Sequence, residues 1–197
     1  TKAEDFKVNS KIKSNLSKQE YEVAFNNIKK YIRNGDCYQV NFAQHFSTKL
    51  EGNVWSVYRK LREFNPAPFS AYINHPSGVI LSSSPERFLS LTGKHVETKP
   101  IKGTKHRSAF VYEDKELAVS LLESKKDRAE NLMIVDLLRN DISKSCELGS
   151  VNVPKLFALE SFSTVHHLVS TISGSLANNK DAIDLIKGCF PGGSITG

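Results

Sequence analysis

Three segments of the chain carry side chains whose types and spacing suit acid–base, nucleophilic or metal chemistry. In the first, Ser84–Phe88, Glu86 stands between a proline and Arg87 directly after a strand-like run. A carboxylate held in such a rigid setting can act as a general acid or base. The simpler reading is a surface glutamate paired with its neighbouring arginine, and composition alone favours it.

The second segment, Lys99–Thr104, places Lys102 between an isoleucine and a glycine. A lysine amine becomes a nucleophile when desolvation or nearby cations leave it neutral. Lys99, Lys105 and Arg107 supply positive charge close by in the sequence. The alternative is an ordinary basic loop, since runs of charge are usually solvated.

In the third segment, residues 127–136, helical spacing predicts that Asp127 and Glu130 share one face, because residues three apart are neighbours on a helix. Two carboxylates so placed can bind a hard cation such as Mg²⁺ through oxygen. The alternative is that these carboxylates only favour the positive end of the helix dipole, and spacing alone does not decide against it.

Two weaker signals lie further along the chain. His166 and His167 fall in an apolar, β-branched run, so a strand would point them to opposite faces. A buried histidine needs a partner or a function, and a satisfied core histidine is the commoner outcome. The glycine-rich run Pro191–Gly197 offers backbone N–H groups and the Ser194 hydroxyl, which could cradle an anion.

The elements that must position these side chains alternate between helical and strand patterns. Ser17 and Glu20 form a capping box that opens a helix, and Asn34-Gly35 ends it. Tyr38–Phe42 alternates apolar and polar residues, which predicts a strand. Further helices are predicted at 54–64, 114–124, 127–139 and 181–190, and strands at 69–74, 79–84, 88–91, 95–98, 150–159 and 163–173. This order predicts an α+β fold with antiparallel pairing.

Composition restricts the class of protein. With 197 residues, 39% of them hydrophobic, the chain is long enough for one domain with a real core. The net charge of +6 comes from scattered lysines without aromatic residues between them, so we expect no nucleic-acid partner. No apolar run approaches membrane-spanning length, and we expect no membrane partner. Three widely spaced cysteines indicate free thiols in a reducing, cytoplasmic setting.

Both ends of the chain are unusual for a complete protein. It begins at Thr1 without methionine and stops in a glycine-rich turn. We therefore expect a piece cut at both ends, in which residues 1–16 are a linker or the end of a preceding segment. Residues 17–197 are then expected to be the N-terminal part of a catalytic domain.

Five motifs, in their order along the chain, carry a resemblance to a known family. They read SPERF at 84–88, PIKGT at 100–104, DRAENLMIVDLLRND at 127–141, VHHLVS at 165–170 and FPGGSITG at 190–197. The sequence resembles the chorismate-binding enzymes over residues 17–197. That family includes the first components of anthranilate synthase and aminodeoxychorismate synthase, isochorismate synthase and salicylate synthase.

The resemblance implies an antiparallel-sheet sandwich with outer helices and an Mg²⁺-dependent reaction on chorismate. By position in the motifs, Glu130 is the implied metal ligand, with Asp127 beside it, and Glu86 the implied general acid or base. The implied substrate contacts are Gly103, Thr104, His167 and Ser194.

Lys102 separates the subfamilies. Anthranilate synthases usually carry alanine there, whereas the aminodeoxychorismate synthase subfamily is similar to this sequence in carrying lysine. The resemblance implies that Lys102 adds covalently to the chorismate ring, and that ammonia from a partner glutamine amidotransferase then displaces it. The alternatives are an anthranilate, isochorismate or salicylate synthase and, outside enzymes, a basic nucleic-acid-binding module. Because the family keeps a second metal-binding glutamate and carboxylate-binding residues beyond the motifs found here, we expect this chain alone to be inactive.

Overall fold

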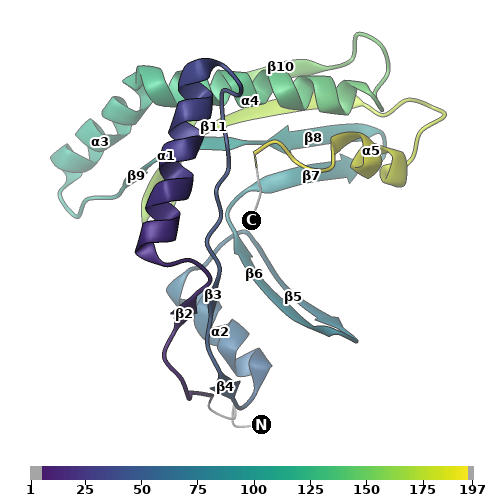
Figure 1. Ribbon diagram of the computed structural model, residues 1–197. Helices are drawn as coiled ribbons and strands as arrows, with labels where there is room; N and C mark the ends of the chain where they lie inside the picture. The colour runs from purple at the N-terminus through teal and green to yellow at the C-terminus, as the bar shows by residue number, and fades with distance from the viewer. Residues whose placement is uncertain (1–5, 195–197) are drawn as a thin grey trace. The chain divides into compact units, whose positions relative to one another are not determined.

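The computed structural model describes residues 6–194 and divides into two compact units that meet in the chain between Ser83 and Ser84 (Figure 1). Helices and antiparallel strands occur in both units. The predicted α+β class with antiparallel pairing is therefore confirmed.

The first unit joins short strands, two helices and a hairpin. Strand β1 pairs with β4 and β2 with β3, and β5 and β6 form a two-stranded sheet. The elements are β1 (Lys7–Val8), β2 (Lys13–Ser14), α1 (Lys18–Asn34), β3 (Phe46–Ser47), β4 (Leu50–Glu51), α2 (Val54–Phe64), β5 (Phe69–His75) and β6 (Gly78–Ser84). The predicted assignment of residues 1–16 to a linker stays a prediction, although two of these short strands lie within residues 6–16.

Helix α1 begins and ends where its sequence predicts. The Ser17 hydroxyl accepts a hydrogen bond from the Glu20 N–H, and the Glu20 carboxylate accepts one from the Ser17 N–H at 2.7 Å. Gly35 ends the helix in the left-handed region, at a φ of 81° that a side chain would oppose. In α2, Trp55 and Tyr58 pack with Tyr72 of β5 in an aromatic cluster, which joins the helix to the hairpin.

The strand predicted at Tyr38–Phe42 is wrong. The structure has no strand there, and the next strand is the two-residue β3. Tyr38 is 74% exposed and Val40 is 42% exposed, so the alternation does not correspond to a buried face. A period of two favours a strand only where a neighbouring strand supplies the hydrogen bonds, and no described strand forms a β-ladder with this segment.

The second unit is built on a five-stranded antiparallel sheet in the order β10-β11-β8-β7, with β9 pairing with the first half of β11. Helix α4 packs along β11 and β9 (Figure 1). The elements of this second unit are β7 (Arg87–Thr92), β8 (His95–Lys99), β9 (Ile101–His106), α3 (Val111–Glu123), α4 (Lys125–Ser143), β10 (Asn152–Ser161), β11 (Val165–Ser175) and α5 (Ala182–Cys189).

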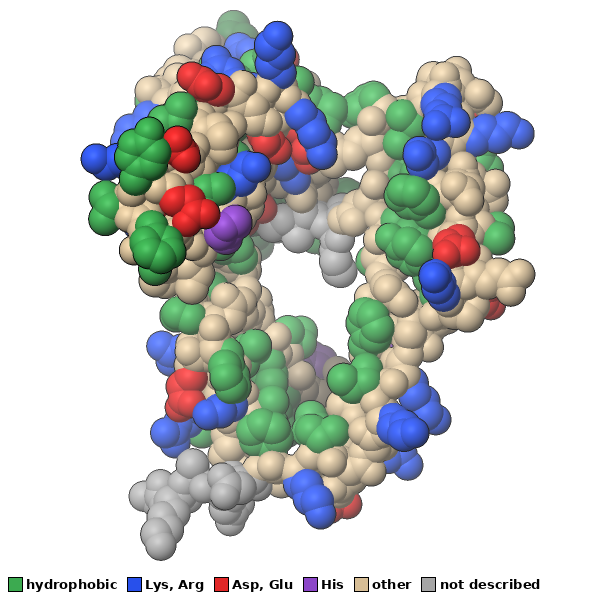
Figure 2. All heavy atoms as spheres, turned by 90° about the vertical axis from the view of Figure 1, so that its left-hand side faces the viewer, with side chains coloured by type: hydrophobic (Ala, Val, Ile, Leu, Met, Phe, Trp, Pro, Cys, Tyr) green, Lys and Arg blue, Asp and Glu red, His purple; other side chains and the backbone are tan. Residues whose placement is uncertain are grey.

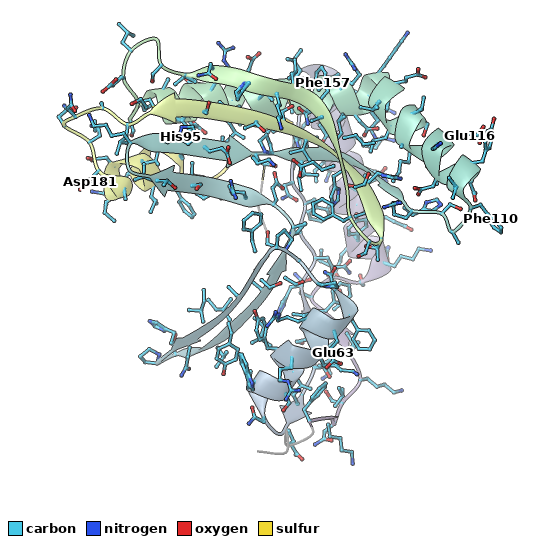
Figure 3. All side chains as sticks on the ribbon, turned by 180° about the vertical axis from the view of Figure 1, so that it is seen from behind. Glu63, His95, Phe110, Glu116, Phe157 and Asp181 are labelled. Carbon is cyan, nitrogen blue, oxygen red and sulfur yellow. The ribbon has the colours of Figure 1, made fainter. Side chains whose placement is uncertain are left out.

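The long strand β11 organises this unit because it pairs with three others. Its even-numbered residues Leu168 and Ile172 are fully buried and face the helices. His95 and Asp181 mark one end of the sheet, Phe110 and Glu116 of α3 mark the other, and Phe157 of β10 lies between them (Figure 3). The core itself consists of Val96, Ile134, Val135, Leu138, Ile142, Ile172, Leu176, Leu185 and Cys189.

The basic side chains are scattered over the surface (Figure 2), and the cysteines are free thiols. On the face shown in Figure 2, Lys and Arg side chains are scattered among acidic and hydrophobic ones. Burial raises the pKa of Cys146, and raises that of Cys189 to about 11, so these free thiols are protonated at neutral pH. Within residues 6–194, no helix is both long and apolar enough to cross a membrane.

Candidate active site

Glu86 lies in the second unit directly before β7, and its carboxylate is held on one side. Its Oε1 accepts hydrogen bonds from the Ile101 N–H at 3.0 Å and from the Ser194 hydroxyl at 2.6 Å. The residue is half-buried, and Oε2 has no hydrogen-bond partner among residues 6–194. One carboxylate oxygen is thus fixed, whereas the other has no partner in the described part of the chain.

Lys102 sits on a β-bulge. His167 pairs with Thr104 and Val169 with Ile101, so Lys102 and Gly103 together lie opposite a single residue of β11. A bulge bends the strand locally and redirects a side chain, and bulges are frequent beside active sites. The Lys102 ammonium donates to the Ser194 carbonyl at 3.3 Å. The segment around Lys102, for which the sequence allowed either a basic loop or an active-site lysine, is therefore part of an irregular strand.

Gly103 joins this bulge to helix α4. Its φ of +94° lies in the region that favours glycine. A Cβ on Gly103 would lie 2.9 Å from the Cβ of Asp127, so the strand and the helix approach each other too closely for any other side chain. Asp127 occupies the first turn of α4, where Ser124 caps the helix by accepting from the Asp127 N–H at 3.3 Å. The close approach places Asp127 against the bulge that carries Lys102.

Asp127 and Glu130 form the candidate metal face. Both are half-buried, and neither carboxylate has a hydrogen-bond or ion-pair partner among the described residues. Over the same part of the chain, no group of three or more His, Cys, Asp or Glu side chains could hold a metal ion. Two oxygen donors fit Mg²⁺, which usually takes one or two protein carboxylates and keeps water or substrate oxygens for the rest.

His167 faces the same cluster. Its Nδ1 lies 2.9 Å from the Thr104 hydroxyl, and the Phe162 ring meets the imidazole edge-to-face. The side chain is 8% exposed. Burial lowers the pKa of His167 below its ordinary value, while the charges of Glu86 and Glu160 oppose that shift. We name this group the His167 cluster: Glu86, Lys102, Thr104, His167 and Ser194.

His166 points to the opposite face, as alternation predicts, and it is buried as well. Its Nε2 lies 3.0 Å from Asp114 and its Nδ1 2.8 Å from the Ser161 hydroxyl. Arg107 donates through Nε to both oxygens of Asp114 at 2.8 and 3.0 Å. The Arg107 guanidinium holds the pKa of Asp114 well below its ordinary value. We name this group the His166 cluster: Arg107, Asp114, Ser161 and His166.

Sequence reasoning missed a buried polar bridge at Asn131. Its amide donates to the Leu168 carbonyl at 3.2 Å and its oxygen accepts from the Ser170 hydroxyl at 2.6 Å. Ser170 also accepts from the N–H of Phe157, which has a positive φ of 56°. The signal was available, because an asparagine at a core position of an amphipathic helix requires buried partners. The bridge joins Asn131 of α4, the residue after Glu130, to Leu168 of β11, the residue after His167. It therefore fixes α4 to β11 next to both site residues.

A profile of the family described as chorismate binding enzyme matches residues 1–197. The chain belongs to the chorismate-binding enzyme family. Aminodeoxychorismate synthase component 1 of Escherichia coli is 49% identical over 98% of this chain, which is 43% of that protein. Anthranilate synthase component 1 of Aquifex aeolicus is 40% identical over 94% of this chain and 37% of that protein.

A solved structure agrees with these relatives. Anthranilate synthase component I from Streptococcus pneumoniae TIGR4 superimposes with a TM-score of 0.84 at 35% identity, over 95% of this chain and 41% of that one. This chorismate-binding enzyme chain therefore spans less than half the length of each of these three proteins.

In this member of the chorismate-binding enzymes, contacts between described residues link most of the predicted site residues. Glu86, Lys102 and Ser194 share hydrogen bonds, Gly103 lies against Asp127, and Thr104 binds His167. Two of the three cations expected beside Lys102 are engaged elsewhere. Lys99 pairs with Glu160 at 2.5 Å, and Arg107 belongs to the His166 cluster.

Proposed function

We propose that this chain is the chorismate-aminating part of an aminodeoxychorismate synthase, component I, which makes 4-amino-4-deoxychorismate for para-aminobenzoate and folate synthesis. The observation that carries the proposal is that Lys102, on the bulge of β9, is joined through Ser194 to the Glu86 carboxylate, which the Ile101 N–H also holds. The identity to aminodeoxychorismate synthases supports the choice of subfamily. A cytoplasmic location remains part of the proposal.

Lys102 and Glu86 divide the chemistry between them. The Lys102 nitrogen forms a bond to C2 of the chorismate ring while the bond from C4 to its hydroxyl breaks. Glu86 gives the departing hydroxyl a proton, so that water leaves. Ammonia then forms a bond to C4 as the bond from C2 to Lys102 breaks, and Glu86 recovers a proton from the incoming nitrogen. A lysine nucleophile thereby splits one displacement into two easier ones.

Other residues of the cluster hold the substrate in this proposal. Gly103 presents backbone close to α4, and Thr104 and His167, bonded to each other, face the ring. Asp127 and Glu130 would hold Mg²⁺. When bound, this ion neutralises carboxylate charge and assists departure of the hydroxyl. Ammonia would come from a glutamine amidotransferase partner, the source implied for this subfamily.

Anthranilate synthase is the second candidate. It is favoured by the Aquifex aeolicus relative at 40% identity and by the Streptococcus pneumoniae structure. Against it stands Lys102, where the resemblance implies alanine for anthranilate synthases. An isochorismate or salicylate synthase would use water rather than ammonia at the ring, and no feature of the described residues favours one.

The test uses the full gene product with chorismate, ammonia and Mg²⁺, and identifies the product by mass spectrometry. We expect aminodeoxychorismate from the wild type and a substrate adduct on Lys102 in the trapped enzyme. Lys102→Ala should keep chorismate binding, lose most of this product and yield at most a trace of anthranilate. Lys155→Ala, which removes an exposed lysine of β10 in the same sheet, is the control and should keep the product and the adduct.

Anthranilate as the main wild-type product would move the protein to the second candidate. Aminodeoxychorismate formed at the wild-type rate by Lys102→Ala, with no adduct in the wild type, would exclude the covalent route. Turnover by residues 1–197 alone would contradict the expectation that this part of the relatives' length is inactive by itself.

A further inference from the structure

We infer that Ser194 is a positioning residue that couples Glu86 to Lys102, rather than a residue that binds substrate. This inference rests on the proposed function, because it assigns a role within the same site. Ser194 contacts both reacting groups at once. Its hydroxyl donates to Glu86 at 2.6 Å, and its carbonyl accepts from the Lys102 ammonium at 3.3 Å.

The two glycines before Ser194 explain how it reaches this place. A Cβ on Gly192 would lie 2.8 Å from the Phe88 ring, and a Cβ on Gly193 would lie 2.0 Å from the Leu137 side chain. Real Cβ atoms do not approach other atoms so closely, so a side chain at either position would have to displace the Phe88 ring or the Leu137 side chain, or move this backbone segment, which passes through a narrow slot between them. Phe88 follows Glu86 by two residues and Leu137 belongs to α4, so the slot fixes the segment to both elements.

Hydrogen-bond capacity decides between positioning and substrate binding. A serine hydroxyl has one hydrogen to donate, and here it is donated to Glu86. It cannot at the same time donate to a carboxylate of the substrate. The Ser194 hydroxyl therefore acts through Glu86 in this arrangement, whereas the sequence alone suggested that it helps to cradle an anion.

The consequence for Glu86 is a fixed orientation. Oε1 receives two hydrogen bonds, from a backbone N–H and from Ser194, while Oε2 has no partner among residues 6–194. A rotating carboxylate would present either oxygen to the leaving hydroxyl, whereas this one presents Oε2. Groups fixed in advance of the reaction cost no reorganisation when it occurs.

The experiment measures kcat and KM for chorismate in the full gene product. Ser194→Ala should lower kcat by about ten- to a hundredfold, the scale of one hydrogen bond to a charged group. KM should not change. Ser194→Thr keeps a hydroxyl and should restore most of kcat. Ser120→Ala, which removes an exposed hydroxyl bonded only within its own helix, is the matched control and should match the wild type.

A double-mutant cycle separates action through Glu86 from a structural loss. In the Glu86→Gln background, Ser194→Ala should have no further effect on kcat, because residues that act as a unit are not additive. Full additivity, or a raised KM at unchanged kcat, would overturn the inference.

A reaction-independent measurement distinguishes this inference from the proposed function. The rate at which acetic anhydride labels Lys102 should rise in Gly192→Ala, because this substitution displaces the Ser194 carbonyl. The rate should stay unchanged in Ser194→Ala, because that variant keeps the backbone carbonyl. Equal labelling in Gly192→Ala and the wild type would overturn the coupling to Lys102. A wild type that aminates no chorismate but shows this labelling pattern would contradict the proposed function alone.

Discussion

His166 and His167 are neighbours that point to opposite faces of β11, and the polar clusters named after them differ in how completely their groups are paired. In the His166 cluster, Asp114 accepts from Arg107, from the Ser108 N–H and from His166, and the second nitrogen of His166 meets Ser161. In the His167 cluster and on the adjacent face of α4, Glu86 Oε2, Asp127 and Glu130 have no partner among residues 6–194.

The difference separates structure from chemistry better than residue type does. Both clusters contain a buried histidine, a carboxylate, a cation and a hydroxyl. A fully paired cluster stabilises the fold and has nothing left for a ligand, whereas partly paired, half-buried groups cost stability unless something binds them. The irregular pairing of β9 with β11 falls beside the second cluster, at Lys102 and Gly103.

The largest effect should come from removing an unpaired carboxylate. In the full gene product, Glu130→Ala should lower the rate of chorismate amination by at least about 10²–10³-fold, the scale of one preorganised charge-stabilising group. Mg²⁺ binding measured by calorimetry should weaken in parallel. Asp136→Ala is the control, since Asp136 lies on the same helix but is exposed and pairs with Arg139. Equal activity in both variants, or full wild-type activity in chelator, would refute the metal role of Glu130.

A smaller loss is expected when the bulge is disturbed without removing any functional group. Gly103→Ala places a Cβ against Asp127 and imposes a positive φ on alanine. Such backbone strain costs about 1–3 kcal/mol, and the strand must shift to relieve the clash. We expect amination to fall by roughly tenfold or more, since about 1.4 kcal/mol corresponds to tenfold. Gly93→Ala, at a hairpin turn with a positive φ but open space, should lose stability without losing activity.

Sequence predicted most of this fold because its signals are local. The Ser17–Glu20 capping box, the Gly35 end of α1 and the proline that follows α2 act within a few residues. The failed strand at Tyr38–Phe42 shows the limit, because a strand depends on a distant partner that periodicity does not reveal. Helix α3 begins three residues before its predicted start. Helix α4 begins two residues before its predicted start and ends four residues beyond its predicted end, where its last turn buries Asp141 and Ile142.

For the candidate site, the residue types were predictable but their connections were not. The sequence motifs predicted Glu86, Lys102 and Ser194 as site residues. The hydrogen bonds among them, however, join Ser194 to Lys102, 92 residues away, and to Glu86, 108 residues away. The bulge at Lys102–Gly103 follows from the register between two strands, which no local pattern contains. The pairing of Arg107 with Asp114 was not predicted, because in the sequence Arg107 shows only as a positive charge near Lys102.

The His166 cluster should respond in stability rather than in activity. His166→Leu removes the bonds to Asp114 and Ser161 from a side chain that is 3% exposed, and leaves Asp114 paired with Arg107. We expect the free energy of unfolding to fall by about 1–3 kcal/mol. The kcat of the remaining folded enzyme should stay at the wild-type value. A large loss of kcat at unchanged stability would show that the fully paired cluster also takes part in the chemistry.

The smallest effect concerns the dependence of stability on pH at His167. Burial sets its folded-state pKa below the ordinary value of 6.5, so the unfolded chain binds the proton more readily than the native protein does. Its contribution is therefore fully present above pH 6.5 and is lost as the pH falls from there through the folded-state pKa. Glu86 and Glu160 oppose the shift and keep the change modest. Urea unfolding of the full gene product at a series of pH values should show this decline in the wild type and a shallower one in His167→Gln. His95→Gln, which removes an exposed histidine at the other end of the sheet, should keep the wild-type slope.

A steeper decline in His167→Gln than in the wild type would mean that the protonated imidazole is stabilised by its carboxylate neighbours. The His167 cluster would then be more fully paired than the comparison with the His166 cluster implies.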